Sequence, residues 1–329
     1  MIQILRDHDM VEKDDNSPVS VSCASDENYY CGLLVTLHSL CTHAAPGSWL
    51  KVHVLDTGLE AASRNDLVKR LSEIPDRRID IQFHDYDPVL FSSCPKWRGG
   101  YSAYARLALQ DILKDEDWTI YTDIDTLWLR DVGELWAMRD RISVLAAVPD
   151  GSGVSYLSSG EMQAKLFSYD GVKVKPADYF CSGLMILNLK RLREIGFLKL
   201  SVDFIAEHKD IMRFADQDVY NWFFQPPDAV MLDWRWGEFS TVYGKRDVES
   251  LRVIHYANQA PWKKRISRVS MFWWEYLHKN IKNSQFSRKA AFRWFAFRCL
   301  KVPLVFYCVY GFHWIFNRQY FRKRKDELF

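Results

Sequence analysis

Two aspartates, Asp123 and Asp125, close a run of apolar and aromatic residues that reads WTIYTDID over 118–125. In an extended chain residues i and i+2 point to the same side, so both carboxylates share one side of the strand end. Carboxylates placed in this way can hold a hard divalent cation such as Mg²⁺ or Mn²⁺, which would stabilise a departing diphosphate. The alternative is an aspartate-rich turn or a helix cap. The flanking apolar residues favour a metal site, because an unpaired carboxylate is costly among them.

Two later segments carry further polar residues with more than one interpretation. His255 lies in RVIHYANQAPWKK and offers an imidazole suited to Mn²⁺-like metals, although a histidine after a short strand can equally be a packed core residue. Asp216, Gln217 and Asp218 begin an expected helix over 216–224. Acidic residues cap and stabilise helix starts, so this run is either structural or a set of sugar contacts.

The elements that must position these residues alternate between strands and helices. We expect strands at 19–25, 50–56, 78–85 and 118–125, and helices at 30–43, 60–74 and 101–113. Later segments are strand-like at 143–148, 183–189 and 252–256, and helical at 198–211 and 216–224. This order predicts an α/β fold, Rossmann-like, with a mostly parallel sheet and flanking helices. Asp26 and the aspartate pair both follow strands, at the sheet edge where such folds bind ligands.

Charge divides the chain unevenly. The net charge is +2, but from residue 280 to the end there are eleven Lys and Arg against Asp326 and Glu327, which is +9, so the first 279 residues carry −7. An acidic body with a basic, aromatic tail indicates two surfaces with two partners. The seven cysteines form no CxxC pair and are odd in number, which favours free thiols in a reducing compartment.

The tail is expected to lie on a membrane. Residues 302–316 are mainly apolar and aromatic but fall short of the ~20 residues that a span needs. A basic cluster follows at 322–325, a pattern typical of segments in the interface of anionic membranes. The alternatives are a helical pair packed on the body, or a nucleic-acid-binding tail, against which the acidic body argues. The first twenty residues show no signal peptide, so we expect a cytoplasmic protein, peripheral on the inner face of the cytoplasmic membrane.

Seven segments, in this order, resemble glycosyltransferase family 8, in particular the bacterial lipopolysaccharide and lipooligosaccharide hexosyltransferases. They are SCASDENYY, YARL, YTDIDTLWL, AAVPD, YFCSGLMILNL, FADQDVYN and HYANQAPWKK, between about residues 19 and 265. The resemblance implies a GT-A fold over residues 19–270. It also implies transfer that retains anomeric configuration, using Mn²⁺ or Mg²⁺. The polar, charged composition of residues 1–18 indicates a flexible extension, and the basic, aromatic composition of residues 271–329 indicates a helical membrane-association tail.

The resemblance also implies roles for individual residues. It assigns the metal to Asp123, Asp125 and His255, and catalytic roles to Asp150, Asp216 and Gln217. The implied donor-binding residues are Ala24, Ser25, Asp26, Asn28, Tyr29, Arg106, Asp123, Ile124, Asp125, Cys181, Ser182 and Lys263.

Two departures from the family pattern concern the donor site. Cys181 stands where the family's FNSG segment has asparagine. The late motif, usually HYxGxxKPW, is one residue shorter and lacks the glycine and the lysine before Pro-Trp, so Lys263 after Trp262 is the candidate replacement. The function implied is transfer of glucose or galactose from a UDP-sugar to a glycan or lipid-linked oligosaccharide in cell-surface polysaccharide synthesis, with no nucleic-acid partner. The alternative is a degenerate protein that binds UDP-sugar without transferring it.

Overall fold

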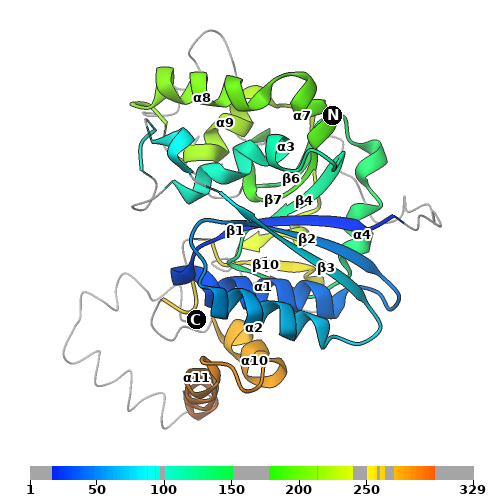
Figure 1. Cartoon of the computed structure of the whole chain (residues 1–329), viewed down its shortest axis with the longest axis vertical. Helices are drawn as coiled ribbons and strands as arrows, with labels where there is room; N and C mark the ends of the chain where they lie inside the picture. The colour runs from blue at the N-terminus through cyan, green and yellow to red at the C-terminus, as the bar shows by residue number, and fades with distance from the viewer. Residues whose placement is uncertain are drawn as a thin grey trace.

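A seven-stranded mixed sheet forms the centre of the molecule (Figure 1). The computed structural model describes residues 17–86, 88–92, 94–96, 101–150, 178–212, 214–239, 250–257, 260–263 and 270–300. The strands run in the order β3-β2-β1-β4-β7-β6-β8. Their bounds are β1 Val19–Ser25, β2 Trp49–Asp56, β3 Arg78–Asp85, β4 Trp118–Thr122, β6 Leu145–Pro149, β7 Phe180–Asn188 and β8 Ala229–Met231.

Strand direction confirms the expected fold class. Among the described residues, every neighbouring pair is parallel except β4–β7 and β6–β7, so β7 is the one antiparallel strand seen there. A small second sheet in the order β5-β10-β9 is made of β5 Thr126–Trp128, β10 Val253–His255 and β9 Glu238–Phe239. The strand expected over 118–125 ends at Thr122, and a turn at residues 123–125 passes the chain to the second sheet.

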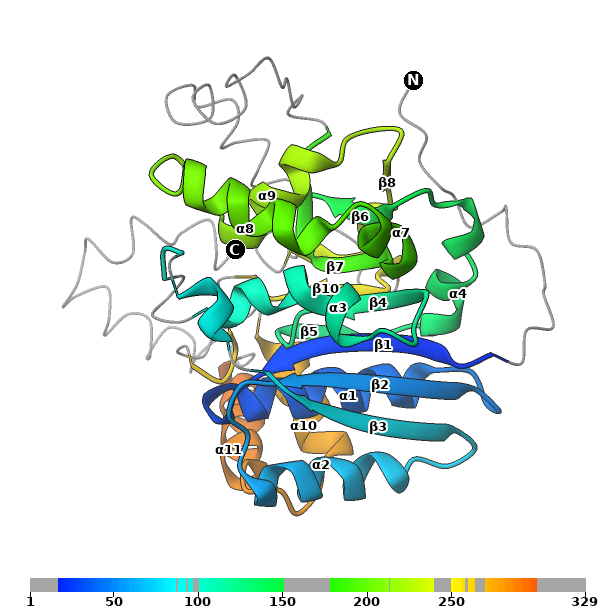
Figure 2. The same cartoon turned by 45° about the horizontal axis from the view of Figure 1, so that its top comes forward.

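Helices cover both faces of the large sheet, with α1 and α2 on one side and α7, α8 and α9 on the other (Figures 1 and 2). The α-helices are α1 Tyr30–His43, α2 Ala61–Ser72, α3 Leu109–Ile112, α4 Val132–Trp136, α7 Leu189–Glu194, α8 Phe197–His208, α9 Ala215–Phe223, α10 Met271–Asn280 and α11 Ser287–Leu300. Short 3₁₀ turns are η2 Glu27–Tyr29, η3 Pro88–Phe91, η4 Ser102–Ala108, η5 Arg139–Arg141 and η8 Trp234–Trp236. The helix expected over 101–113 is therefore a 3₁₀ turn followed by one turn of α-helix.

Two hydrophobic cores lie on opposite faces of the large sheet. Along β7, Leu184 and Ile186 belong to the first core, while Met185 and Leu187 belong to the second. This alternation follows from the two-residue period of a strand. A strand buried on both faces needs apolar residues at every position, which explains the unbroken LMIL run.

The C-terminal segment begins as part of the first core. Trp273, Trp274 and Leu277 of α10 are fully buried, and the Tyr276 hydroxyl lies 2.8 Å from Nδ1 of His38 in α1. None of the helices in the described ranges is both long and apolar enough to cross a membrane. Residues 1–16 of the expected extension at 1–18, the apolar segment at 302–316 and the basic cluster at 322–325 lie outside the described residues.

Candidate active site

The turn after β4 is clamped between strands of both sheets. The amide of Asp123 donates to the carbonyl of Gly183 in β7 at 2.7 Å, and the amide of Tyr256, after β10, donates to the carbonyl of Asp125 at 2.8 Å. The Thr36 hydroxyl of α1 donates to the carbonyl of Ile124 at 2.9 Å. The direction of this turn is therefore set by three elements that are distant in the sequence.

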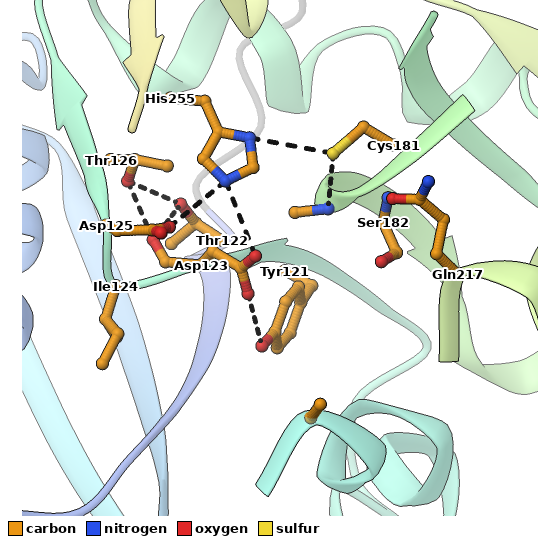
Figure 3. A network of polar contacts seen from close by, with 12 residues as sticks. Tyr121, Thr122, Asp123, Ile124, Asp125, Thr126, Cys181, Ser182, Gln217 and His255 are labelled. Carbon is orange, nitrogen blue, oxygen red and sulfur yellow. Dashed lines mark hydrogen bonds and ion pairs between the residues drawn. The ribbon is translucent and has the colours of Figure 1, made fainter. Parts of the chain in front are cut away.

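Asp123, Asp125 and His255 converge at this turn (Figure 3). Nε2 of His255 lies 3.2 Å from a carboxylate oxygen of Asp125 and 3.6 Å from one of Asp123. All three candidate ligand atoms lie within 4.8 Å of one another, and no other such group of three occurs in the part of the chain that the structure describes. The predicted metal ligands are therefore brought together.

The donor set and its surroundings fit a divalent cation. Two carboxylate oxygens and one imidazole nitrogen are ligands that Mn²⁺ accepts. The backbone of Gly183 lies against the cluster, where a β-carbon would be 2.3 Å from Cε1 of His255 and 2.8 Å from a carboxylate oxygen of Asp123. Only glycine leaves that room. Sequence reasoning missed this residue, although the Ser-Gly pair in YFCSG was a visible signal.

Opposing effects set the protonation of the cluster. Burial disfavours the charged form of Asp123, but Arg106, His255 and Tyr121 outweigh it and lower the pKa of the carboxyl. Burial likewise opposes a charge on His255, yet its neighbours Cys181, Asp125 and Asp123 hold its pKa well above the ordinary value. A cation bound at Nε2 would therefore have to displace a proton.

Arg106 joins the cluster to the start of α9. Its guanidinium lies 2.7 Å from a carboxylate oxygen of Asp123 and 3.1 Å from one of Asp216, and it donates to the Ser182 carbonyl at 2.7 Å. Burial opposes its charge, but the two aspartates raise its pKa well above the usual value. Its carbon Cζ lies 4.5 Å from the centre of the Tyr121 ring. Tyr121, like Gly183, is a site residue that sequence reasoning missed.

A polar wall continues from Arg106 and consists of Asp150, Ser182, Asp216 and Gln217. The Gln217 amide donates to Asp150 at 2.8 Å, and its oxygen accepts from the Ser182 backbone at 3.2 Å. The Ser182 hydroxyl donates to Asp216 at 2.8 Å. Burial raises the pKa of Asp216 to about 6, against the lowering effects of Arg106 and Ser182. All four residues are buried. The fold therefore brings together four of the residues that were predicted to act in catalysis or donor binding.

Asp218 has a different task from its two neighbours. Its carboxylate accepts from the Tyr179 hydroxyl at 2.8 Å and from the Phe214 amide, four residues back, at 2.8 Å. Ala215 between them has φ of 44°, a left-handed conformation that costs energy in any residue but glycine. Asp218 therefore stabilises the strained start of α9 that presents Asp216 and Gln217. Of the two interpretations of residues 216–218, the structural one applies to Asp218.

The loop after β1 holds the expected nucleoside-binding residues. Ala24 and Ser25 end the strand, and Asn28 is exposed. One carboxylate oxygen of Asp26 is buried and accepts no hydrogen bond from the described residues. A buried acceptor of this kind is costly unless a ligand donates to it. The ammonium of Lys263 lies 3.4 Å from the centre of the Tyr29 ring, so the late segment meets this loop.

Cys181 faces the cluster of Asp123, Asp125 and His255. Its sulfur lies 3.7 Å from Nδ1 of His255 and accepts from the Gly183 amide at 3.3 Å (Figure 3). Burial raises the pKa of this thiol, while the neighbouring His255 acts in the opposite direction. Cys181, which departs from the family pattern, thus contacts Nδ1 of His255, while Nε2 of the same ring faces the two aspartates.

Comparisons with known proteins agree with this geometry. The model of glycosyl transferase family 8 matches residues 20–265. General stress protein A of Bacillus subtilis is 27% identical over 274 residues, covering 74% of this chain and 86% of that protein. Glucoside xylosyltransferase 2 of Mus musculus is 25% identical over 221 residues, covering 60% of this chain and 48% of that protein.

Solved structures share the fold. The galactosyltransferase LgtC, in complex with donor and acceptor sugar analogues, superposes with a TM-score of 0.68 at 24% identity, over 83% of this chain and 100% of that one. The bifunctional glycosyltransferase WbbM superposes with a TM-score of 0.66 at 19% identity, over 86% of this chain but 53% of that one. The family model covers most of the chain and the sheet matches these GT-A folds, so this protein belongs to glycosyltransferase family 8.

Proposed function

We propose that this glycosyltransferase moves glucose or galactose from a UDP-sugar to a glycan or lipid-linked oligosaccharide, with retention of configuration. The observation that carries the proposal is the convergence of Asp123, Asp125 and His255 beside the Arg106 and Asp216 pair. A metal-binding cluster and a polar wall in contact are the two parts that transfer from a nucleoside diphosphate sugar requires.

Asp123, Asp125 and His255 would hold Mn²⁺ or Mg²⁺. The ion would neutralise the negative charge of the departing diphosphate. Arg106 keeps Asp123 ionised through the 2.7 Å ion pair and so maintains a ligand ready for the cation. The carbonyl of Ile124 accepts from Thr36, which holds the middle of the turn in place beneath the donor.

The nucleoside would lie in the loop after β1. The buried, unsatisfied oxygen of Asp26 suits an N–H donor such as N3–H of uracil. Asn28 is exposed and free to turn toward the ribose, and Tyr29 offers a ring face for the base. Lys263, over that ring, brings a positive charge toward the diphosphate.

The sugar would lie against the wall of Asp150, Ser182, Asp216 and Gln217. Gln217 is an uncharged amide and a poor nucleophile. We therefore favour front-face attack, in which the leaving phosphate oxygen accepts the proton of the acceptor hydroxyl. The carboxylates of Asp150 and Asp216 would stabilise positive charge that develops on the sugar ring. Gln217, held at both ends of its amide, would keep its position through the reaction.

The C-terminal segment would bring the protein to its acceptor at the inner face of the cytoplasmic membrane. Arg288, Phe292 and Phe295 are spaced at i, i+4 and i+7 on α11, and all three are exposed, the phenylalanines by 66% and 62%. One basic and two aromatic side chains along one helix face suit an anionic lipid surface. At such a location the enzyme would serve cell-surface polysaccharide synthesis.

A panel of nucleotide sugars tests the proposal. UDP-glucose or UDP-galactose should raise the melting temperature in the presence of Mn²⁺, while GDP-mannose and samples with EDTA should show no rise. Equal stabilisation by GDP-mannose and the UDP-sugars would overturn the uridine assignment, and full stabilisation in EDTA would overturn the metal assignment.

A second candidate, a protein that binds UDP-sugar without transferring it, rests on Cys181. Its thiol contacts His255, so this position places no amide toward the sugar. Slow hydrolysis of radiolabelled donor separates the two candidates. An active transferase should release labelled hexose into water in the absence of acceptor, whereas the binding protein should release none at saturating donor and Mn²⁺.

A further inference from the structure

Trp262 lies between the nucleotide loop and the C-terminal helices. Its ring fills the space beside Gly32 of α1, where a β-carbon would be 2.3 Å from Cη2 of Trp262 and 2.7 Å from the carbonyl of Ile124. Its edge also meets the Tyr29 ring, with centroids 6.2 Å apart. The indole therefore packs against the turn at residues 123–125 (the metal turn) and against the loop after β1 (the nucleotide loop).

The other side of Trp262 is held by α10 and α11. The ring of Trp273, fully buried in α10, lies 5.4 Å from that of Trp262. The ammonium of Lys289 in α11 donates to the Trp262 carbonyl at 3.1 Å. Two residues from the C-terminal helices thus fix both the side chain and the backbone of one residue in the late segment.

The two helices lie below α1 and α2 in Figure 1 and contact both of them. The Arg70 guanidinium of α2 donates to the carbonyls of Lys282 and Asn283, in the turn between α10 and α11, at 2.8 and 3.3 Å. Phe286 packs on Tyr30 with ring centroids 6.1 Å apart. Because α10 and α11 are held against α1 and α2, their contacts can hold Trp262 in one position relative to the body.

We infer that α10 and α11 form a positioning element of the donor site, with Lys289 and Trp262 as its contact. Lys263 follows Trp262 directly, so the geometry that fixes Trp262 also sets the ammonium of Lys263 over Tyr29 at 3.4 Å. This inference rests on the proposed function, which places the nucleotide against Tyr29. Small displacements of such contacts weaken binding strongly, because the donor must meet the metal turn and the loop together.

Lys289→Met tests the inference, since it removes the ammonium and keeps the length of the side chain. Lys282→Met is the matched control, because the Lys282 ammonium also donates to a backbone carbonyl, that of His278 at 2.7 Å, but within the helical pair. Lys289→Arg should restore the contact. In the full chain with Mn²⁺, we expect Lys289→Met to weaken UDP binding about tenfold and to raise KM for donor, with kcat and acceptor KM unchanged. Both other variants should match the wild type.

Hydrogen exchange separates this inference from the proposed function. Peptides that contain Trp262 should exchange faster in Lys289→Met than in Lys282→Met, whether or not any nucleotide is bound. Unchanged exchange together with unchanged UDP affinity would overturn the positioning role. Faster exchange with wild-type UDP affinity would show that the segment is held by Lys289 but does not serve the donor. A wild-type protein that binds no UDP refutes the proposed function alone, and the exchange result still decides the contact.

Discussion

The candidate metal-binding cluster of Asp123, Asp125 and His255 adjoins the polar wall, but the protein satisfies the polar groups of the two regions differently. In the wall, Gln217 and Ser182 bridge Asp150 and Asp216 through hydrogen bonds from uncharged donors. In the cluster, carboxylates of Asp123 and Asp125 share one face with a single imidazole. The polar groups of the wall are thus hydrogen-bonded to one another, whereas the cluster gathers ligand atoms that a bound cation would hold together. The difference teaches that metal binding and sugar binding should be separable by substitution.

The largest expected effect comes from Asp125→Asn. An amide oxygen is a weaker ligand than a carboxylate and removes one negative charge from the cluster. We expect Mn²⁺ affinity to fall steeply and transfer to fall about 10³-fold. Mn²⁺ binding followed by electron paramagnetic resonance, and transfer of labelled hexose, measure the two quantities. Asp203→Asn on the exposed face of α8 is the control, and transfer at the wild-type rate by Asp125→Asn would remove the cluster from the mechanism.

Asp216 provides a stability test of the wall. Its pKa is raised to about 6 from 3.8, so stability from the neutral carboxyl is complete below pH 4 and is lost as pH rises through 6. Between pH 4 and 7, wild-type protein should therefore lose up to about 3 kcal/mol of unfolding free energy relative to Asp216→Asn. Urea unfolding at several pH values measures this, and parallel pH curves for the two proteins would contradict a protonated Asp216.

A third prediction concerns Gln217 and separates the wall from the cluster. Gln217→Ala removes the donor to Asp150 and the acceptor for Ser182, so charge on the sugar would be stabilised less well. We expect kcat to fall about 10²-fold, with Mn²⁺ and UDP affinities within twofold of wild type. Isothermal titration with UDP and steady-state kinetics give both quantities. A loss of UDP affinity equal to the loss of kcat would mean that the two halves are not separable.

Residue type and spacing were enough to predict part of this site. Asp123 and Asp125 follow a strand whose apolar pattern is local, and the sheet order confirms the predicted fold class. Nothing local links Arg106 to Asp216, which are 110 positions apart, because that ion pair arises only when η4 and α9 pack together. Such long-range contacts depend on side-chain packing that no periodicity encodes.

Two other features were beyond sequence reasoning for different physical reasons. Between Ala147 and Val148 of β6 the partner residue on β7 changes from Met185 to Cys181, and a register shift by an odd number of residues reverses which way a strand side chain points. Residues 271–280 were assigned to the membrane-association tail, yet Trp273 and Trp274 of α10 are fully buried. Composition alone cannot separate a tryptophan that packs on a core from one that meets lipid, since both need a large apolar surface.

The smallest expected effect tests how the cluster is supported rather than what it contains. Gly183→Ala would place a β-carbon 2.3 Å from Cε1 of His255, 2.8 Å from a carboxylate oxygen of Asp123 and 2.9 Å from Nε2 of His255. The histidine ring has little room to retreat, because the Cys181 sulfur lies 3.7 Å from its Nδ1. We therefore expect the ligands to move apart and Mn²⁺ affinity to fall about tenfold.

Gly133→Ala is the matched control for this substitution. A β-carbon there would be 3.1 Å from the Asp131 carboxylate, near the start of α4 and outside the site, so Mn²⁺ affinity should not change. Gly183→Ala does not alter the loop that holds Asp26, so the selectivity for uridine should be unchanged. Like the wild type, this variant should not bind GDP-mannose. Since the added methyl lies against the cluster and not against Gln217, weaker Mn²⁺ binding should appear as a transfer rate that high Mn²⁺ restores. A rate that stays low at saturating Mn²⁺ would mean that the methyl disturbs the polar wall as well, and the two halves would then share a support at Gly183.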